Sequence, residues 1–178
     1  MPRRAARTAL RTVRLSQSLN DVLEKDAQSK NLSVNALIST ILTRYAEWDR
    51  YTEKFGFVSV TKELFRTLLS SSTKDHLPQV AEALGRKLPK EVMQFFWRKA
   101  DLQAFLLYIA AFSKYGGLAE YELHQEGEDY VVTAHHELGE NWSIFLKHFL
   151  SAGIQSIFST PPKFEVTSNT VIFRFTPR

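Results

Sequence analysis

Polar and apolar residues alternate along a short segment near the start of the chain. In "RTVRLSQSL", Thr12 and Arg14 fall on one side of an extended segment, while Val13 and Leu15 fall on the other. Alternation with a period of two predicts a β-strand. Because one short strand is not stable alone in water, and the next forty residues indicate helices, its partner must come from elsewhere.

The apolar spacing changes to that of a helix directly after this strand. Within "SLNDVLEKDAQSKN" apolar residues return every three or four positions, with Ser16 or Ser18 as the N-cap and Asn31 at the end. A second helix begins after Ser33, and the lack of Gly and Pro predicts that it continues to Phe55. Its apolar stripe consists of Val34, Leu37, Ile38, Ile41, Leu42, Tyr45 and Trp48.

A strand and two helices of this size bury too little apolar surface to fold as one chain. The simplest solution is a two-fold dimer in which the two copies of the strand pair antiparallel. Thr12 and Arg14 then face outward. The expected dimer core consists of Val13, Leu15, Leu37, Ile38 and Ile41.

The net charge of +4 is confined to the first part of the chain. Residues 1–50 hold nine Lys and Arg against five Asp and Glu, whereas residues 51–178 hold 14 of each. The first 14 residues include no acidic residue and five arginines, Arg3, Arg4, Arg7, Arg11 and Arg14. Such an arm is typical of nucleic-acid binding, although a solubilising tail or a membrane-surface arm has a similar composition.

Residues 10–46 resemble a ribbon-helix-helix DNA-binding domain of the Arc, MetJ and CopG type. The resemblance rests on the alternation that ends in Leu-Ser, on the amphipathic helix, and on the "NLSVNALI" opening of the next helix. It implies that the paired strands enter the major groove, where Thr12 and Arg14 read base edges. Arginine suits O6 and N7 of guanine, and threonine can bond a base or touch a thymine methyl.

The resemblance also implies how the protein holds the DNA backbone. The N-terminus of the second helix, formed by Ser33, Val34 and Asn35, would bind phosphate through backbone N–H groups. The arginines of the arm, Arg3, Arg4 and Arg7, would follow the backbone or a minor groove. One position departs from the family pattern, because Arg11 stands where an apolar residue is usual and Leu10 takes the outward register. Neither Leu10 nor Arg11 is assigned a groove contact.

All 13 phenylalanines lie at Phe55 or later, which indicates a second folding unit with a different core. We predict a basic arm over residues 1–9, a DNA-binding domain over 10–50 and an α+β domain over 51–178. Its helices are expected at about 61–70, 73–87, 90–98 and 101–115, with Pro89 in the first turn of the third. The order ββαββ follows over 118–176, with hairpins turning at Gly127-Glu128 and Ser168-Asn169. This order predicts an antiparallel four-stranded sheet covered by one helix.

No residue pattern in this second unit indicates catalysis, so we expect no catalytic residue, no cofactor and no enzyme. Cysteine is absent, and the sequence has no phosphate-binding glycine loop and no nucleophile elbow. One hairpin face carries the possible metal ligands Glu120, Glu122, His124 and His135, but an exposed polar face is the favoured interpretation and no metal is expected. A small apolar ligand could fit a Phe-rich core, although ordinary packing is favoured.

These observations lead to one main hypothesis and two alternatives. The main one is a cytoplasmic, homodimeric, sequence-specific DNA-binding protein, a transcriptional regulator that reads a pseudo-palindromic site. Its C-terminal domain would sense a small molecule, bind a protein or extend the oligomer. An antitoxin or plasmid-maintenance protein with a protein partner is the first alternative. The second is a small-molecule-binding protein or enzyme whose N-terminal unit serves only to dimerise. No apolar run is long enough to span a membrane, and no secretory signal is recognisable.

Overall fold

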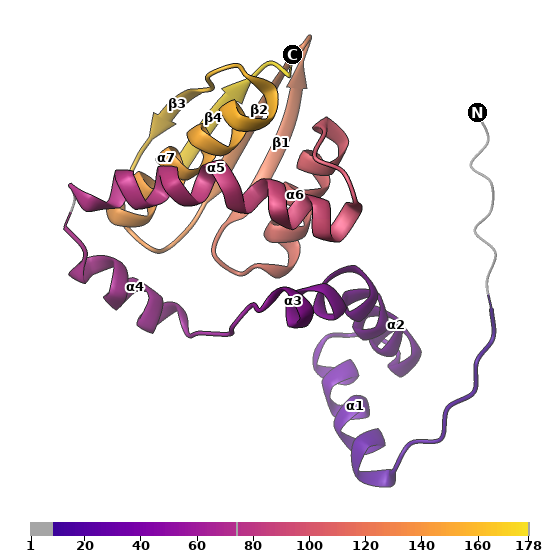
Figure 1. Ribbon diagram of the computed structural model, residues 1–178. Helices are drawn as coiled ribbons and strands as arrows, with labels where there is room; N and C mark the ends of the chain where they lie inside the picture. Colours follow the sequence, from indigo (N-terminus) through magenta and orange to yellow (C-terminus); the bar gives the residue numbers. More distant parts are fainter. Residues whose placement is uncertain (1–8, 74, 178) are drawn as a thin grey trace. The chain divides into compact units, whose positions relative to one another are not determined.

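The computed structural model describes residues 9–73 and 75–177 (Figure 1). Its chain divides into two compact units, one ending at Ala46 and the other beginning at Glu47. Helices and a four-stranded antiparallel sheet make the protein α+β, as the sequence predicts. Among the described residues, no helix has both the length and the apolar character needed to cross a bilayer.

The first unit contains the helices α1 (Gln17–Ser29) and α2 (Val34–Arg44). Both begin at a serine, because the Ser16 hydroxyl accepts a hydrogen bond from the Leu19 N–H and the Ser33 hydroxyl accepts one from the Ala36 N–H. Between the helices Asn31 adopts the left-handed conformation, with φ of 53°. The predicted caps at Ser16 and Ser33 and the predicted role of Asn31 are therefore confirmed.

Helical structure continues beyond α2, also as predicted, but not as one uniform α-helix. A π-helical turn, η1 (Tyr45–Asp49), precedes α3 (Arg50–Phe55), which ends at Gly56 with φ of 88°. Within the second unit, the Glu47 carboxylate accepts hydrogen bonds from the Tyr115 hydroxyl at 2.6 Å and from Lys114 Nζ at 3.1 Å. These bonds attach η1 to α6 (Leu102–Tyr115), and the Tyr115 bond, helped by Lys114, lowers the pKa of Glu47 below its usual value.

The sheet of the second unit consists of two hairpins. The strands β1 (Glu120–Glu126) and β2 (Asp129–His135) form the first, and β3 (Lys163–Val166) and β4 (Thr170–Phe175) form the second. The strand order is β1-β2-β4-β3, and every neighbouring pair is antiparallel. In this register the apolar faces of the two hairpins coincide, and Val132, Ala134, Val171, Phe173 and Phe175 are all buried.

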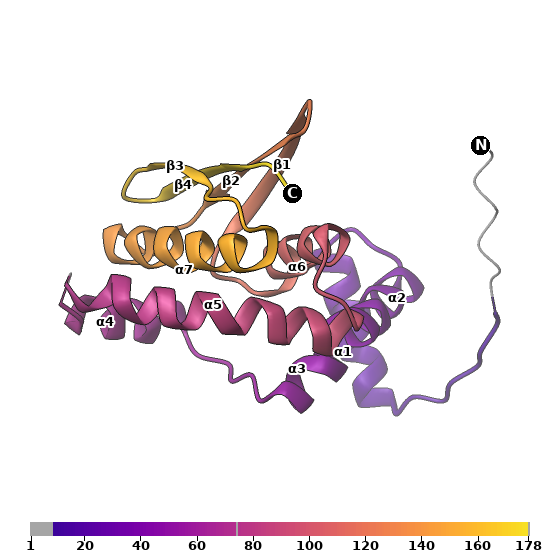
Figure 2. The ribbon, with the colours of Figure 1, turned by 45° about the horizontal axis from the view of Figure 1, so that its top comes forward.

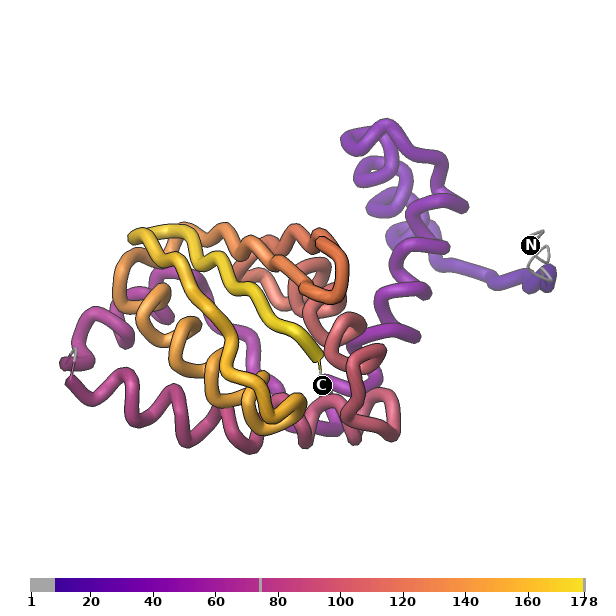
Figure 3. The backbone as a smooth tube through the Cα atoms, turned by 90° about the horizontal axis from the view of Figure 1, so that it is seen from above, coloured from indigo at the N-terminus to yellow at the C-terminus, as the bar shows by residue number. Residues whose placement is uncertain are grey.

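Three layers make up most of the second unit. The helix α7 (Glu140–Phe158) covers the apolar face of the sheet, and α5 (His76–Trp97) packs on the opposite side of α7 (Figure 2). The second hairpin runs along α7, as the yellow end of the tube shows (Figure 3). The two helices approach closely because glycines face the contact. A Cβ atom on Gly85 of α5 would overlap the carbonyl oxygen of Phe149, and one on Gly153 of α7 would lie 3.2 Å from the Gly85 oxygen.

Two further helices, α4 (Lys62–Ser71) and α6 (Leu102–Tyr115), complete the unit. The sequence correctly predicts these two helices but wrongly predicts two separate helices over 73–87 and 90–98. Instead α5 is continuous and contains Pro89 in its interior. A proline there lacks the N–H that would bond the Gly85 carbonyl. Its ring is nevertheless buried against α7, where its Cγ would lie 3.2 Å from a Cβ on Gly153, and this packing offsets the lost bond.

Candidate nucleic-acid interface

The segment that the sequence assigns to DNA reading precedes α1. Residues 9–16 have no regular secondary structure in the single chain, and the side chains of Thr12 and Arg14 are exposed. Leu10 and Arg11 are exposed as well. Because the expected strand partner is a second copy of this segment, the ribbon itself stays a prediction.

The sequence assigns phosphate binding to the first turn of α2, which Ser33 caps. The Ser33 hydroxyl caps the Ala36 N–H at 3.2 Å, and the Leu37 N–H bonds the Ser33 carbonyl at 3.0 Å. The N–H groups of Val34 and Asn35 belong to the first turn, where a helix offers no backbone acceptor. This turn carries no acidic side chain, so the positive end of the helix dipole is not neutralised there.

Exposed basic side chains occur on the segment before α1 and on α1 itself. Arg11 and Arg14 are exposed on the segment before α1, and Lys25 and Lys30 are exposed at α1 and its C-cap. The arginines assigned to the arm, Arg3, Arg4 and Arg7, lie outside the described residues.

The apolar residues of the first unit are largely exposed in the single chain. Among its described residues only Ala27 and Leu37 are buried apolar side chains. Of the other expected core residues, Ile38 is half-buried, whereas Val13, Leu15 and Ile41 are exposed, Val13 by 73%. The large apolar side chains left exposed in this unit are Leu10, Val13, Leu15, Leu19, Val22, Leu32, Ile41, Leu42 and Tyr45. So many exposed large apolar side chains in one small unit point to a surface that a partner covers.

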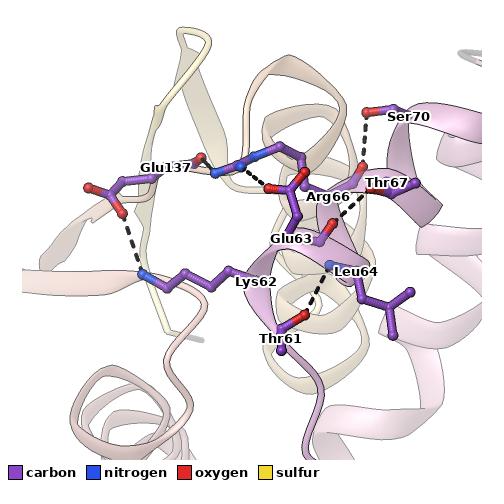
Figure 4. A network of polar contacts seen from close by, with 8 residues as sticks. All are labelled: Thr61, Lys62, Glu63, Leu64, Arg66, Thr67, Ser70 and Glu137. Carbon is purple, nitrogen blue, oxygen red and sulfur yellow. Dashed lines mark hydrogen bonds and ion pairs between the residues drawn. The ribbon is translucent and has the colours of Figure 1, made fainter.

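Several polar groups of the second unit join α4 to the chain near the start of α7. Arg66 of α4 donates a hydrogen bond to the Glu137 carbonyl at 2.9 Å and pairs with Glu63 at 2.7 Å (Figure 4). Lys62 lies 3.5 Å from the Glu137 carboxylate, and the Asn141 amide donates to the Leu69 carbonyl at 2.9 Å. These contacts attach α4 to the loop before α7 and to the first turn of α7.

The two adjacent histidines differ in environment, because His135 is exposed and His136 is buried. His136 is buried and its Nδ1 lies 3.3 Å from the Leu138 N–H, which can only donate, so Nε2 carries the proton towards the Ser143 hydroxyl at 2.9 Å. Burial, with a smaller effect of the His135 charge, lowers the pKa of His136. His136 is therefore neutral near pH 7 and joins the end of β2 to α7. The sequence did not indicate this pair.

The possible metal face is also in the predicted register, since Glu120 lies opposite His135. His135 Nδ1 lies 3.3 Å from the Thr170 hydroxyl oxygen. The described part of the chain contains no group of three or more His, Cys, Asp or Glu side chains arranged to hold a metal ion. Comparison with known proteins gives no assignment, because no family model matches the chain and no curated protein is similar enough to match it.

Proposed function

We propose that the protein is a homodimeric, sequence-specific DNA-binding protein of the ribbon-helix-helix type that regulates transcription. The observation that carries the proposal is the exposed apolar surface of the first unit. It includes Val13 and Leu15 of the segment in which polar and apolar side chains alternate, and among the described apolar residues of the first unit only Ala27 and Leu37 are buried. A second copy of the same unit would cover this surface.

In the single chain, the backbone groups of residues 12–15 have no strand partner and the side chains of Val13 and Leu15 are exposed. Antiparallel pairing of this segment with its copy would change both. The unpaired backbone groups would find partners, and Val13 and Leu15 would turn towards the helices α1 and α2. Burying a side chain such as Val13 or Leu15 contributes about 1.5–3 kcal/mol. Thr12 and Arg14 would then project from the outer face of a two-stranded ribbon, which fits the major groove.

The charges of the first unit support DNA as the partner. The N-terminus of α2, with Ser33, Val34 and Asn35, offers N–H groups to a phosphate. Five arginines and no acid among the first 14 residues add a sequence-independent attraction to the backbone.

The second unit bears on the alternatives. Its four-stranded sheet and its buried aromatic core, which includes Phe105, Phe173 and Phe175, make a folded body. A segment that folds only around a protein partner, as an antitoxin tail does, is usually polar and poor in aromatics. A regulator with a separate sensing or oligomerising domain therefore fits this chain better than an antitoxin.

Selection of bound sequences from random duplex DNA, at two salt concentrations, tests the proposal. We expect a recovered site with two inverted half-sites, because a two-fold dimer reads two-fold DNA. Strongly salt-dependent binding with no common motif would replace the proposal with an architectural role. If the protein bound no DNA, the proposal would be wrong and the first unit would serve only to dimerise.

Replacing Arg14 with alanine tests the assigned reading residue. We expect Arg14→Ala to lose about 1–3 kcal/mol of preference for the selected site over a mutated site, because a bidentate contact to guanine disappears. The control is Lys25→Ala, which removes one exposed positive charge from α1 and should leave that preference unchanged. Sedimentation should show dimers for both variants. Equal preference in Arg14→Ala and the parent protein would exclude Arg14 as a reader.

A further inference from the structure

The second unit encloses a cavity of about 220 Å³. It lies among α5, α6, α7 and the start of β1, and side chains from α4 and from the loop before it line the remaining side. Its wall is made almost entirely of Leu, Val, Phe and Ala side chains, with Phe65, Leu88 and Ala119 among them. The more exposed wall residues, Phe57 and Leu84, mark the side on which a small molecule has access.

Three polar groups interrupt this apolar wall. Tyr108 on α6 and Tyr121 on β1 both line the cavity, and no hydrogen bond joins either hydroxyl to another described residue. Burial raises the pKa of Tyr121 to about 12 and raises that of Tyr108 as well, with a smaller effect of Tyr121 on Tyr108. Both phenols are therefore protonated near neutral pH and close enough to affect each other. The third group, the indole N–H of Trp142, is buried and has no hydrogen-bond partner in the described structure.

A buried hydrogen-bonding group without a partner is costly for a folded protein, and among the described residues the Trp142 indole N–H is such a group. A single water molecule takes up about 30 Å³ of liquid volume, so it would leave most of the cavity empty. A molecule with an apolar body and one oxygen would fill the space and bond the hydroxyls together.

We propose that this cavity is a binding site for a small, uncharged aromatic molecule that carries one hydrogen-bonding oxygen, which the Tyr108 and Tyr121 hydroxyls hold. An apolar cavity of about 150 Å³ accommodates benzene, so 220 Å³ suits a benzene ring with a short substituent. The wall contains no charged side chain, which disfavours ionised ligands. The site does not depend on the proposed DNA binding.

Two small molecules of nearly the same shape provide the first test. Acetophenone carries a carbonyl oxygen, and isopropenylbenzene has a CH₂ group in its place. Calorimetric titration of the full-length protein should show one saturable site for acetophenone, with isopropenylbenzene binding roughly fivefold to tenfold more weakly, because the hydrogen bond is lost. Equal affinities, or no binding of acetophenone, would overturn the proposal.

Single substitutions then locate the site. Tyr108→Phe and Tyr121→Phe remove only the hydroxyl, and at least one of them should abolish the difference between the two ligands. The control Tyr130→Phe alters a tyrosine of β2 that stacks on Phe175 outside the cavity, and it should preserve that difference.

Filling the cavity by Ala119→Leu should weaken the binding of both ligands at least tenfold, with circular dichroism verifying the fold. Unchanged acetophenone binding in Ala119→Leu would place binding elsewhere and refute the site. If Ala119→Leu does not fold, Leu88→Phe replaces it in the same comparison.

Discussion

The neutral imidazole of His136 connects two elements through two hydrogen bonds of opposite direction. Its Nδ1 accepts from the Leu138 N–H, and its Nε2 donates to the Ser143 hydroxyl. Protonation would turn Nδ1 into a donor facing another donor, so the charged form conflicts with the folded structure. This conflict, together with burial, makes the histidine sensitive to pH.

We expect the free energy of unfolding to fall as the pH is lowered below about 6.5, the ordinary pKa of histidine. The folded state has the lowered pKa, so below 6.5 the unfolded chain binds a proton that the folded chain does not. Above 6.5 both states are neutral and this contribution is constant. Urea unfolding at pH 7.5 and pH 5 measures the difference.

The variant His136→Gln should show a smaller loss of stability between these pH values, since glutamine does not titrate. His124→Gln, at an exposed histidine of β1, should keep the full loss. In addition, Ser143→Ala should cost about 1–3 kcal/mol at pH 7.5, because it leaves the buried Nε2–H unpaired. The same pH dependence in His136→Gln as in the parent would assign the effect to other groups.

At the residue scale, the sequence predicts local placement better than long-range pairing. Period-two alternation correctly puts His135 on the exposed face and His136 on the other. Their partners could not be predicted in the same way. The Ser143 hydroxyl reaches His136 only because Gly139, with φ of 81°, turns the chain between them, and the cavity tyrosines become neighbours only when α6 packs beside β1.

At the scale of elements, the contact between α5 and α7 depends on two glycines, Gly85 and Gly153, which have no side chain to separate the helices. Replacing Gly85 with alanine adds a Cβ that overlaps the Phe149 carbonyl oxygen. Alanine favours a helix over glycine by about 1 kcal/mol, but forced separation of packed elements typically costs about 1–3 kcal/mol. We therefore expect Gly85→Ala to lower the free energy of unfolding by up to about 2 kcal/mol in urea titrations.

An exposed site on the same helix provides the control for this measurement. Gln79→Ala should change stability by less than about 0.5 kcal/mol, because Gln79 is exposed on α5. A stability gain in Gly85→Ala, of the size expected from helix preference alone, would contradict the close approach of α5 and α7.

The same contact explains why one element was predicted wrongly. Proline usually marks the first turn of a helix, so the sequence favoured a break before Pro89. Burial of its ring against Gly153 keeps α5 continuous, and this contact joins residues far apart in the chain. By contrast, the hairpins depend on local turns such as Gly127-Glu128, and their register was predicted correctly. The fold class and the helix-capping serines were thus accessible from sequence, whereas packing between helices was not.

At the scale of the whole molecule, the two units differ in how much apolar surface they bury. The second unit has its own core, from Trp48 to Phe175, whereas the described part of the first unit buries only Ala27 and Leu37 among its apolar residues. We expect a fragment of residues 47–178 to unfold cooperatively, with a midpoint independent of protein concentration. In the full chain, the transition of the first unit should move to higher temperature as concentration rises, because dimerisation stabilises it. Circular dichroism at two concentrations tests both expectations, and a concentration-independent full chain would exclude the dimer.

The uneven charge of the chain provides a last test of how the protein holds DNA. Each phosphate contact that releases a counterion contributes about 0.9 to the slope of log K against log salt concentration. Deleting residues 1–8 removes Arg3, Arg4 and Arg7, so the slope should become shallower by up to about 3, while preference for the selected site over a mutated one stays the same. Arg14→Ala should instead reduce the preference for the selected site over a mutated one, since it removes a base contact. Fluorescence anisotropy at four salt concentrations measures the salt slope and the site preference.

An unchanged slope after the deletion would mean that the arm does not contact the DNA backbone. A lost preference after the deletion would mean that the arm reads sequence in a minor groove.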